Sequence, residues 1–566
     1  MTDNLTPEGI PEPEGEVNLI DTDYSIGQDN IEGSVGPFGF DIHNPVFLVS
    51  GLTIVAFVFY ALALPDQAAD MFGRLRPFLT STFDWFFLGA ANIFVLFCLL
   101  LIVLPLGNVR LGGDEATPDY SYIGWFAMLF AAGMGIGLMF YGVSEPLSHY
   151  STSMGGITVG EDGVRTDWAP LGAAAGDETG AIRLGMSATI FHWGLHPWAI
   201  YAIVALALAL FTYNKGLPLT IRSAFYPIFG ERIWGWWGHV VDTLAVFATL
   251  FGLATSLGLG AKQAASGLTF LFGTGDSEAG TRAFLGIPYG NADPAVDSTM
   301  LLVLLITAIT AIALLSVVRG LDGGVKVLSE INMGLAALLL VFVLLVGPTM
   351  AILTGFGANL WAYIQNLPAL SMPFGRDDVN FAQGWTSFYW AWWISWSPFV
   401  GMFIARVSRG RTVREFVIAV LLVPSLVCVL WMSVFGGVAI QQVVQDGYTA
   451  VQDASLEVQL FEMLKELPLA TITSVIGIVL VIVFFVTSSD SGSLVIDTIT
   501  AGGKIDAPVP QRVFWATFEG AVAIVLLLGG GLTALQAAVI STGLPFTLVL
   551  LLMCFAIFRG LMSERR

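Results

Sequence analysis

Long apolar stretches recur along the whole chain, and they constrain its fold more than any other feature. A helix needs roughly 20 apolar residues to cross a bilayer. Hydrophobic residues make up 55% of the 566 residues and charged residues 12%, where soluble domains carry about 25% charged residues. The sequence therefore predicts an all-α polytopic membrane protein. It contains twelve candidate spans, at about 44–64, 84–107, 121–143, 185–212, 238–272, 299–318, 329–355, 386–408, 414–440, 470–500, 513–531 and 533–558.

The basic residues orient these spans, because Lys and Arg concentrate on the cytoplasmic side of a membrane. With the N-terminus in the cytoplasm, the inner segments hold 15 of the 23 basic residues and the outer loops hold 7. This split predicts twelve helices with both termini in the cytoplasm.

The formal net charge of -20 needs a separate explanation. The tail 1–42 holds ten acidic residues and no Lys or Arg, a composition that predicts a disordered or loosely packed segment. Fifteen of the other 33 acids fall in the loops 144–184, 271–298 and 441–469, which lie outside in the predicted topology. An acidic chain of this kind is not expected to bind nucleic acid.

Two shorter segments mix aromatic and polar residues. Residues 358–369 carry Trp361 and Tyr363 among polar positions, which predicts a helix along the membrane surface. Residues 222–237 hold aromatic anchors beside Arg222 and Arg232, which is typical of a segment at the membrane interface.

The third span contains Gly133, Gly135 and Gly137, although glycine costs about 1 kcal/mol each in a helix. Small residues four apart commonly mediate close helix packing, but these glycines are two apart. We therefore favour an unwound stretch, which many transporters use at mid-membrane to build substrate and ion sites.

The eighth span holds five of the 16 tryptophans within residues 385–396, and Pro398 there is expected to break the helical hydrogen-bond ladder. The fourth span adds Trp193, Trp198 and Tyr201. An interfacial belt usually needs fewer tryptophans, whereas cages of them bind quaternary ammonium groups. No acid lies in these aromatic clusters, which favours a zwitterionic substrate.

His192 and His196 are four residues apart in the fourth span, but the sequence places no carboxylate beside them. We therefore predict packed histidines rather than a metal site. No nucleophile–base pair is apparent in the spans, so an enzyme is not expected.

Hydroxyl and carboxyl groups gather at the end of the tenth span, at Thr487, Ser488 and Asp490. The hydroxyls could bond back to helix carbonyls, or they could bind a small cation, and the sequence favours neither. Asp490, Asp497, Asp242 and Glu519 are costly at membrane depth and invite a functional explanation.

Five motifs in order resemble the betaine/carnitine/choline transporter family, in particular its sodium-coupled glycine betaine symporters. They are Met134–Gly142, Phe191–Trp198, Ser256–Gly260, Trp390–Arg411 and Thr487–Ser491. The resemblance implies a LeuT-type fold, in which two extra helices precede two inverted five-helix repeats, spans 3–7 and 8–12. It also implies a homotrimer in a prokaryotic cell (inner) membrane, with lipid around it.

The implied division of the chain has six parts. These are the tail 1–42, two peripheral helices in 43–120, the first repeat in 121–356, the surface helix and linker 357–384, the second repeat in 385–558 and the C-terminus 559–566.

The resemblance also implies site residues. Trp193, Trp198, Tyr201 and Trp393 would form an aromatic cage, Trp392 and Trp396 would line the pathway, and Phe399 would gate it. The unwound backbone at Gly133, Met134, Gly135 and Gly137 would face the substrate. One sodium would bind carbonyls of Ala131, Met134 and Phe484 and hydroxyls of Thr487 and Ser488.

Two positions separate this chain from relatives within the family. Choline carriers place an Asp at Gly137, so a glycine there resembles carriers of zwitterions. The second sodium site would use Thr249, but Leu253 replaces its partner threonine and offers no oxygen; Thr255 or Ser256 would have to substitute.

Together these features predict import of a zwitterionic onium compatible solute, glycine betaine or a close analogue, by sodium symport with alternating access. Sodium is the coupling ion, and no cofactor is expected. The alternative within the family is a sodium-independent or proton-coupled carrier or exchanger of choline or carnitine.

Overall fold

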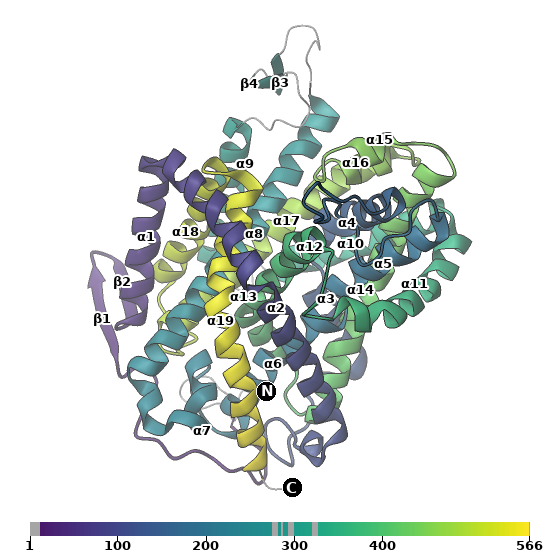
Figure 1. The fold of residues 1–566 in the computed structure, drawn as a ribbon. Coiled ribbons are helices and arrows are strands. Elements are labelled where there is room, and N and C mark those ends of the chain that lie inside the picture. The colour runs from purple at the N-terminus through teal and green to yellow at the C-terminus, as the bar shows by residue number, and fades with distance from the viewer. Residues whose placement is uncertain (1–11, 274–280, 285–286, 292–298, 320–325, 565–566) are drawn as a thin grey trace.

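The computed structural model describes residues 12–564 apart from 274–280, 285–286, 292–298 and 320–325. The described part is a bundle of long helices (Figure 1). One end of the bundle carries α7 and the C-terminal end of α19, and a small hairpin, β3 and β4, projects from the opposite end (Figure 1). The predicted acidic loop 271–298 lies largely outside the described residues.

The first half of the chain forms the helices that surround and build one side of the bundle. They are α1 (Val46–Ala63), α2 (Pro65–Val103), α3 (Tyr122–Gly133), α4 (Ile136–Gly155), α5 (Glu178–Trp193), α6 (Leu195–Ala209), α7 (Tyr226–Phe229), α8 (Trp236–Phe272), α9 (Thr299–Arg319) and α10 (Lys326–Val346). The hairpin strands β3 (Thr281–Phe284) and β4 (Ile287–Asn291) precede α9 and pair antiparallel.

The second half adds the helices that pack against these. They are α11 (Thr349–Leu370), α12 (Val379–Phe381), α13 (Ser387–Val407), α14 (Val413–Val444), α15 (Ala450–Asp453), α16 (Gln459–Lys465), α17 (Ala470–Thr500), α18 (Val509–Leu528) and α19 (Gly531–Met562). Local sequence signals start several of them. Thr412 and Glu415 form a reciprocal capping box at α14, and Asp177 caps α5.

Ten helices of the described residues are long and apolar enough to cross a membrane, or eleven spans when the bent pair α3 and α4 counts as one. These spans overlap eleven of the twelve predicted spans. The remaining one is α13, which carries the tryptophan-rich motif and does not meet this criterion of hydropathy. Its residues are nevertheless almost all buried, because it lies against α6, α8 and α19 inside the bundle.

Several predicted boundaries were wrong. The second span was predicted at 84–107, but α2 begins at Pro65 and runs for 39 residues. At 1.5 Å per residue it is about 58 Å long, and it crosses the bundle diagonally beside α19 (Figure 1). The seventh span was predicted to reach 355, but α10 ends at Val346 and the predicted surface helix begins nine residues early, as α11 at Thr349.

The acidic tail 1–42 was predicted to be disordered or loosely packed, and disorder does not hold for its described part. Strands β1 (Asn30–Val35) and β2 (Phe38–His43) pair as an antiparallel hairpin. The segment before them lies across the end of the bundle. Its side chains have partners there: Glu14 pairs with Arg409, and Tyr24 stacks on Trp234. Composition alone does not predict such contacts.

The long connection between α4 and α5 also has a defined conformation. Arg165 is 8% exposed and donates to Asp167, to Asp377 and to the carbonyls of Ala169 and Leu171. Burial alone would raise the pKa of Asp167, but hydrogen bonds from Arg165 and from backbone amides outweigh it and lower this pKa to about 2. The loop is therefore docked on the segment that precedes α12.

Asp242 on α8 balances its charge locally. Its two oxygens accept from the backbone amide of Arg222 at 2.9 Å and from Nε of the same residue at 2.5 Å. Both side chains are buried. Removal of one member of a buried pair leaves the other charge without a partner, at a cost of about 3–5 kcal/mol.

We therefore expect Asp242→Asn to lower the apparent melting temperature of the detergent-purified protein clearly. The control is Asp70→Asn, which breaks the exposed pair of Asp70 with Arg74 and should change stability by about 1 kcal/mol or less. Equal melting temperatures for the two variants would contradict the assignment.

Candidate functional site

A break between α3 and α4 opens the centre of the bundle. The two helices meet at 66°, and Gly135 between them is fully extended, with φ -173° and ψ -176°. The amide of Met134 bonds back to the carbonyl of Ala131 at 3.2 Å and ends α3. The predicted unwinding at this glycine motif is thus present, and it leaves backbone facing a cavity, as unwound backbone in a membrane requires.

Gly137, just after the break, allows two tryptophans to approach the backbone. A Cβ placed on Gly137 would lie 2.8 Å from a ring carbon of Trp193 and 2.8 Å from one of Trp392. Contacts under 3.0 Å do not occur for real Cβ atoms, so either ring would have to move. A side chain at this position would displace the aromatic residues that surround the cavity.

Aromatic residues of α5, α6 and α13 form a box around this point. The ring centroids of Trp193 and Trp393 lie 5.2 Å apart with the planes nearly perpendicular, at 86°. Tyr201 lies 5.3 Å from Trp393 and 5.4 Å from Trp198. Edge-to-face rings at these separations attract one another, and Trp193, Trp198 and Tyr201 are at most 2% exposed.

The orientation of each indole is fixed by a hydrogen bond to a different acceptor. Trp393 donates to the carbonyl of His192 and Trp396 to that of Gly252, both at 2.9 Å. Trp392 donates to the hydroxyl of Ser256 at 2.9 Å. A buried N–H without a partner is costly, so these bonds select one rotamer for each ring.

The cavity at the break has a volume of about 50 Å³ and is lined by apolar, aromatic and backbone groups. Its lining includes most of the predicted substrate residues. Trp198 and Phe399 do not line it; Trp198 packs behind Gly133 and Phe399 against Trp396. The structure adds Val400, which the sequence did not single out, and Ser256, which was considered only as a substitute sodium ligand. The lining consists of Ala132, Gly133, Met134, Gly135, Ile136, Gly137, Leu138, Trp193, Tyr201, Ser256, Trp392, Trp393, Trp396 and Val400.

Pro398 was expected to interrupt α13, but the helix continues from Ser387 to Val407. A proline removes one backbone donor and frees the carbonyl four residues before it. That carbonyl belongs to Ile394, and the hydroxyl of Ser397 donates to it at 2.7 Å. Ser397 thus replaces the missing donor, a compensation that the tryptophan pattern does not reveal.

The predicted sodium ligands lie on two separate elements. Ala131 and Met134 are at the end of α3, and Phe484, Thr487 and Ser488 are on α17. The hydroxyl of Thr487 donates to the carbonyls of Val483 at 3.0 Å and Phe484 at 3.3 Å. Its Oγ keeps a lone pair that can bind a cation, so both interpretations of this hydroxyl stay open and the sodium site stays a prediction.

The region of the possible second sodium site is tightly packed. Thr249 donates to the carbonyl of Ala245 at 2.7 Å, and Leu253 presses against Gly492 of α17. Thr255 donates to the carbonyls of Phe251 and Leu535, and Ser256 holds the indole of Trp392. Both proposed substitutes therefore already have structural partners.

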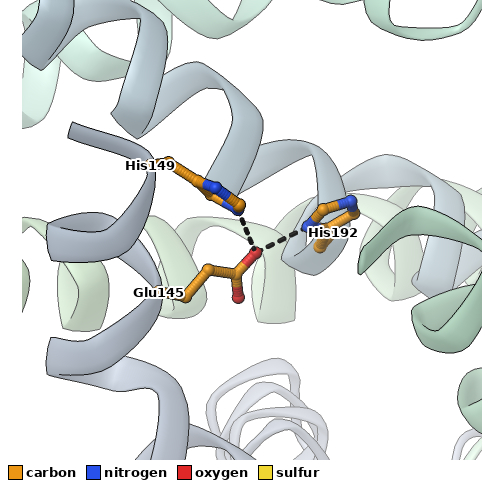
Figure 2. A group of neighbouring side chains, drawn as sticks. All are labelled: Glu145, His149 and His192. Atoms are coloured by element: carbon orange, nitrogen blue, oxygen red, sulfur yellow. Dashed lines mark hydrogen bonds and ion pairs between the residues drawn. The ribbon is translucent and has the colours of Figure 1, made fainter. Parts of the chain in front are cut away.

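A buried carboxylate stands directly behind the aromatic box. Glu145 of α4 is fully buried, and Figure 2 shows His149 and His192 converging on one of its oxygens. His149 Nε2 lies 3.2 Å and His192 Nδ1 2.6 Å from Oε1. The other oxygen accepts from the indole of Trp193 at 2.7 Å and from the hydroxyl of Tyr389 at 2.5 Å.

This arrangement corrects the prediction that no carboxylate stands beside the histidines of the fourth span. Glu145, His149 and His192 offer three ligand atoms within 4.8 Å of one another, as a metal site would. The carboxylate is, however, already bonded by four donors, and His192 also bonds the hydroxyl of Thr386 at 2.9 Å. We therefore infer that this group positions the side chains bonded to it, Trp193 and Tyr389, and does not bind a metal. His196 instead bonds Asn92 and stacks on Trp390.

The comparison with known proteins identifies the family. Residues 45–566 match the profile of the betaine/carnitine/choline family transporters. The chain belongs to this family. It is a multi-pass membrane transporter of bacterial type and not an enzyme.

Named relatives of the family cover almost the whole chain. A glycine betaine/proline/choline transporter of Vibrio parahaemolyticus is 65% identical over 99% of this chain and 97% of its own. A second protein of that organism, glycine betaine transporter 1, is 55% identical over 97% of this chain and 98% of its own. A glycine betaine transporter of Bacillus subtilis is 41% identical over 93% and 95%.

Glu145 was not predicted as a site residue, because the third span was predicted to end at 143. The helix α4 in fact continues to Gly155 and carries Glu145 into the interior. A signal was present in the sequence, since Glu145 and His149 are four residues apart and share a helix face. The predicted outer loop 144–184 is therefore shorter than expected and its first acid is not part of the surface.

Glu145→Gln should weaken substrate binding in this transporter, because an amide cannot accept from all four donors. Charge-assisted hydrogen bonds contribute about 1.5–3 kcal/mol, so loss of the bond to Trp193 should raise the substrate Kd about tenfold. The measurement is calorimetric titration with glycine betaine, together with the tryptophan emission spectrum.

Tyr389→Phe is the matched control, since it removes one donor and keeps the carboxylate. It should change the Kd by less than a few-fold. A wild-type Kd and an unchanged emission spectrum in Glu145→Gln would contradict a positioning role.

Proposed function

We propose that this transporter imports a zwitterionic onium solute, glycine betaine or a close analogue, by sodium symport with alternating access. The observation that carries the proposal is the uncharged aromatic box beside the break between α3 and α4. The names of the relatives include glycine betaine in each case described above, which supports the same class of substrate.

The chemistry of the box suits an onium group. Indole faces attract a quaternary ammonium with about 0.5–2 kcal/mol each, most strongly where water is excluded. The residues that line the cavity include no acid, and Glu145 behind them already has four donors. A substrate that brings its own carboxylate needs no counter-charge from the site. The exposed backbone at Gly135 would face that carboxylate or the ion.

The fold supports alternating access. We infer two inverted five-helix repeats of the LeuT type, with α3 and α4 together as the first span of one repeat and α13 as the first span of the other. Both contribute lining residues to the cavity. Rocking of one repeat against the other would open the cavity to each side in turn. Trp392 and Trp396 would line the path toward the cytoplasm, and Phe399 would gate it.

Sodium would couple at the predicted ligands Ala131, Met134, Phe484, Thr487 and Ser488. The break supplies carbonyls on one side and α17 supplies hydroxyls on the other, which are the hard oxygen ligands that alkali cations use. A cation that enters with the substrate also draws on the membrane potential, about 2.3 kcal/mol per charge per 100 mV. The family resemblance supports a homotrimer, and the distribution of basic residues supports cytoplasmic termini.

Proteoliposomes test the coupling. Uptake of labelled glycine betaine should be concentrative with an inward sodium gradient and should fall to the passive level when potassium replaces sodium. Thr487→Ala with Ser488→Ala should abolish the stimulation by sodium. Equal uptake in both salts would favour the alternative, a sodium-independent or proton-coupled exchanger.

The cage is tested by Trp393→Ala, which removes the ring that contacts Trp193, Trp198 and Tyr201. The Kd for glycine betaine should rise about tenfold or more, as expected from a desolvated cation–π contact. Trp237→Ala is the control, since Trp237 is 61% exposed. An unchanged Kd in Trp393→Ala would refute the cage.

Choline is the second candidate substrate, because the name of the 65% identical relative includes it. Choline carries the same onium head without a carboxylate. Competition by choline and by glycine betaine against the same labelled substrate separates the two, and a preference for choline would overturn the proposal of a zwitterion.

A further inference from the structure

Two acids in the membrane-spanning helices belong neither to the aromatic box nor to the Glu145 network. Glu519 lies near the middle of α18, and Asp490 lies on α17. Their exposed fractions are 0% and 1%. Acidic residues at membrane depth are costly and persist where they have a partner or a function.

The contacts of these two acids leave oxygen atoms without partners. The hydroxyl of Ser489 donates to Glu519 Oε2 at 2.9 Å and ties α17 to α18. Glu519 Oε1 and Asp490 Oδ2 are buried without a hydrogen bond. Ser316 of α9 lies beside Asp490 and is 5% exposed, and its Oγ has no partner of normal geometry either. Three helices thus direct unpartnered oxygens into one region.

The charges in this region do not balance. Asp490 acts on Glu519 as a second negative charge, and no Lys or Arg among the described residues acts on Glu519. Arg512 acts on Asp490, but its Nε also lies 3.7 Å from Asp497 Oδ2. One guanidinium therefore serves two carboxylates, Asp490 and Asp497. The two other buried acids discussed above differ in this respect, since Asp242 has Arg222 and Glu145 has four donors.

We propose that Asp490, Glu519, Ser489 and Ser316 form a binding site for a monovalent cation, sodium, between α9, α17 and α18. A bridging water would satisfy the hydroxyls but would not offset the charge. A divalent ion such as Ca²⁺ takes six to eight oxygen ligands, whereas the free carboxylate oxygens Glu519 Oε1 and Asp490 Oδ2 and the two hydroxyls offer four. The site is separate from the ligands proposed for coupling, and it exists whether or not those ligands bind.

The experiment measures equilibrium binding of radioactive sodium to the purified full-length protein in potassium buffer. Thr487→Ala with Ser488→Ala serves as the background, because it removes the proposed coupling site. The background protein should still bind about one sodium per chain. Addition of Glu519→Gln, or of Asp490→Asn, should weaken this binding at least tenfold. Monodisperse gel filtration and retained binding of glycine betaine show that each variant is folded.

The outcomes separate this site from the proposed coupling. A folded background protein that binds no sodium overturns the site and leaves symport intact if wild-type uptake requires sodium. Unchanged sodium affinity in Glu519→Gln also overturns it. If both acid variants fail to fold, Ser489→Ala with Ser316→Ala removes two neutral ligands without a change of charge. That variant should weaken sodium binding, and an unchanged affinity overturns the site.

Discussion

An indole N–H buried without an acceptor is costly, and the acceptors of four tryptophans organise the centre of the bundle. Trp193, Trp392, Trp393 and Trp396 each donate to a different acceptor. These acceptors belong to α4, α5 and α8. The rings that line the cavity therefore also link the helices, and movement of one helix has to move the ring that it holds. The geometry of the aromatic box therefore depends on how the helices of the bundle pack.

Buried acids in the bundle fall into two classes that differ in how their charge is satisfied. Glu145 and Asp242 are surrounded by donors, and such groups stabilise one arrangement of the helices. Asp490 and Glu519 have few donors and lie close to one another. A carboxylate with enough hydrogen-bond donors holds its neighbours in place, whereas one with few donors favours a cation nearby. The distinction depends on neighbours from other helices, so residue type and depth alone do not predict it.

The sequence predicted much of the fold, because long apolar runs and glycine spacing are local properties. Eleven of the twelve spans and the break at Gly133–Gly137 followed from such patterns, and the family followed from the resemblance of five motifs. Helix ends were less predictable, because tertiary contacts extend α2 to Pro65 and α4 past Glu145. The aromatic box followed from the density of tryptophans, but Ser256, Val400 and Glu145 join it only through folding. Pro398 was misjudged, since one hydroxyl from Ser397 restores the missing bond.

The acidic N-terminal residues of the described chain neutralise basic side chains at one end of the bundle. Lys504 pairs with Glu32 and Asp41, and Arg409 pairs with Glu14 and Asp119. A count of basic residues in the loops suggests a surface that attracts anionic lipid headgroups. Arg409 and Lys504 are instead paired within the protein, largely with its own N-terminal residues, which leaves less of their charge for such headgroups.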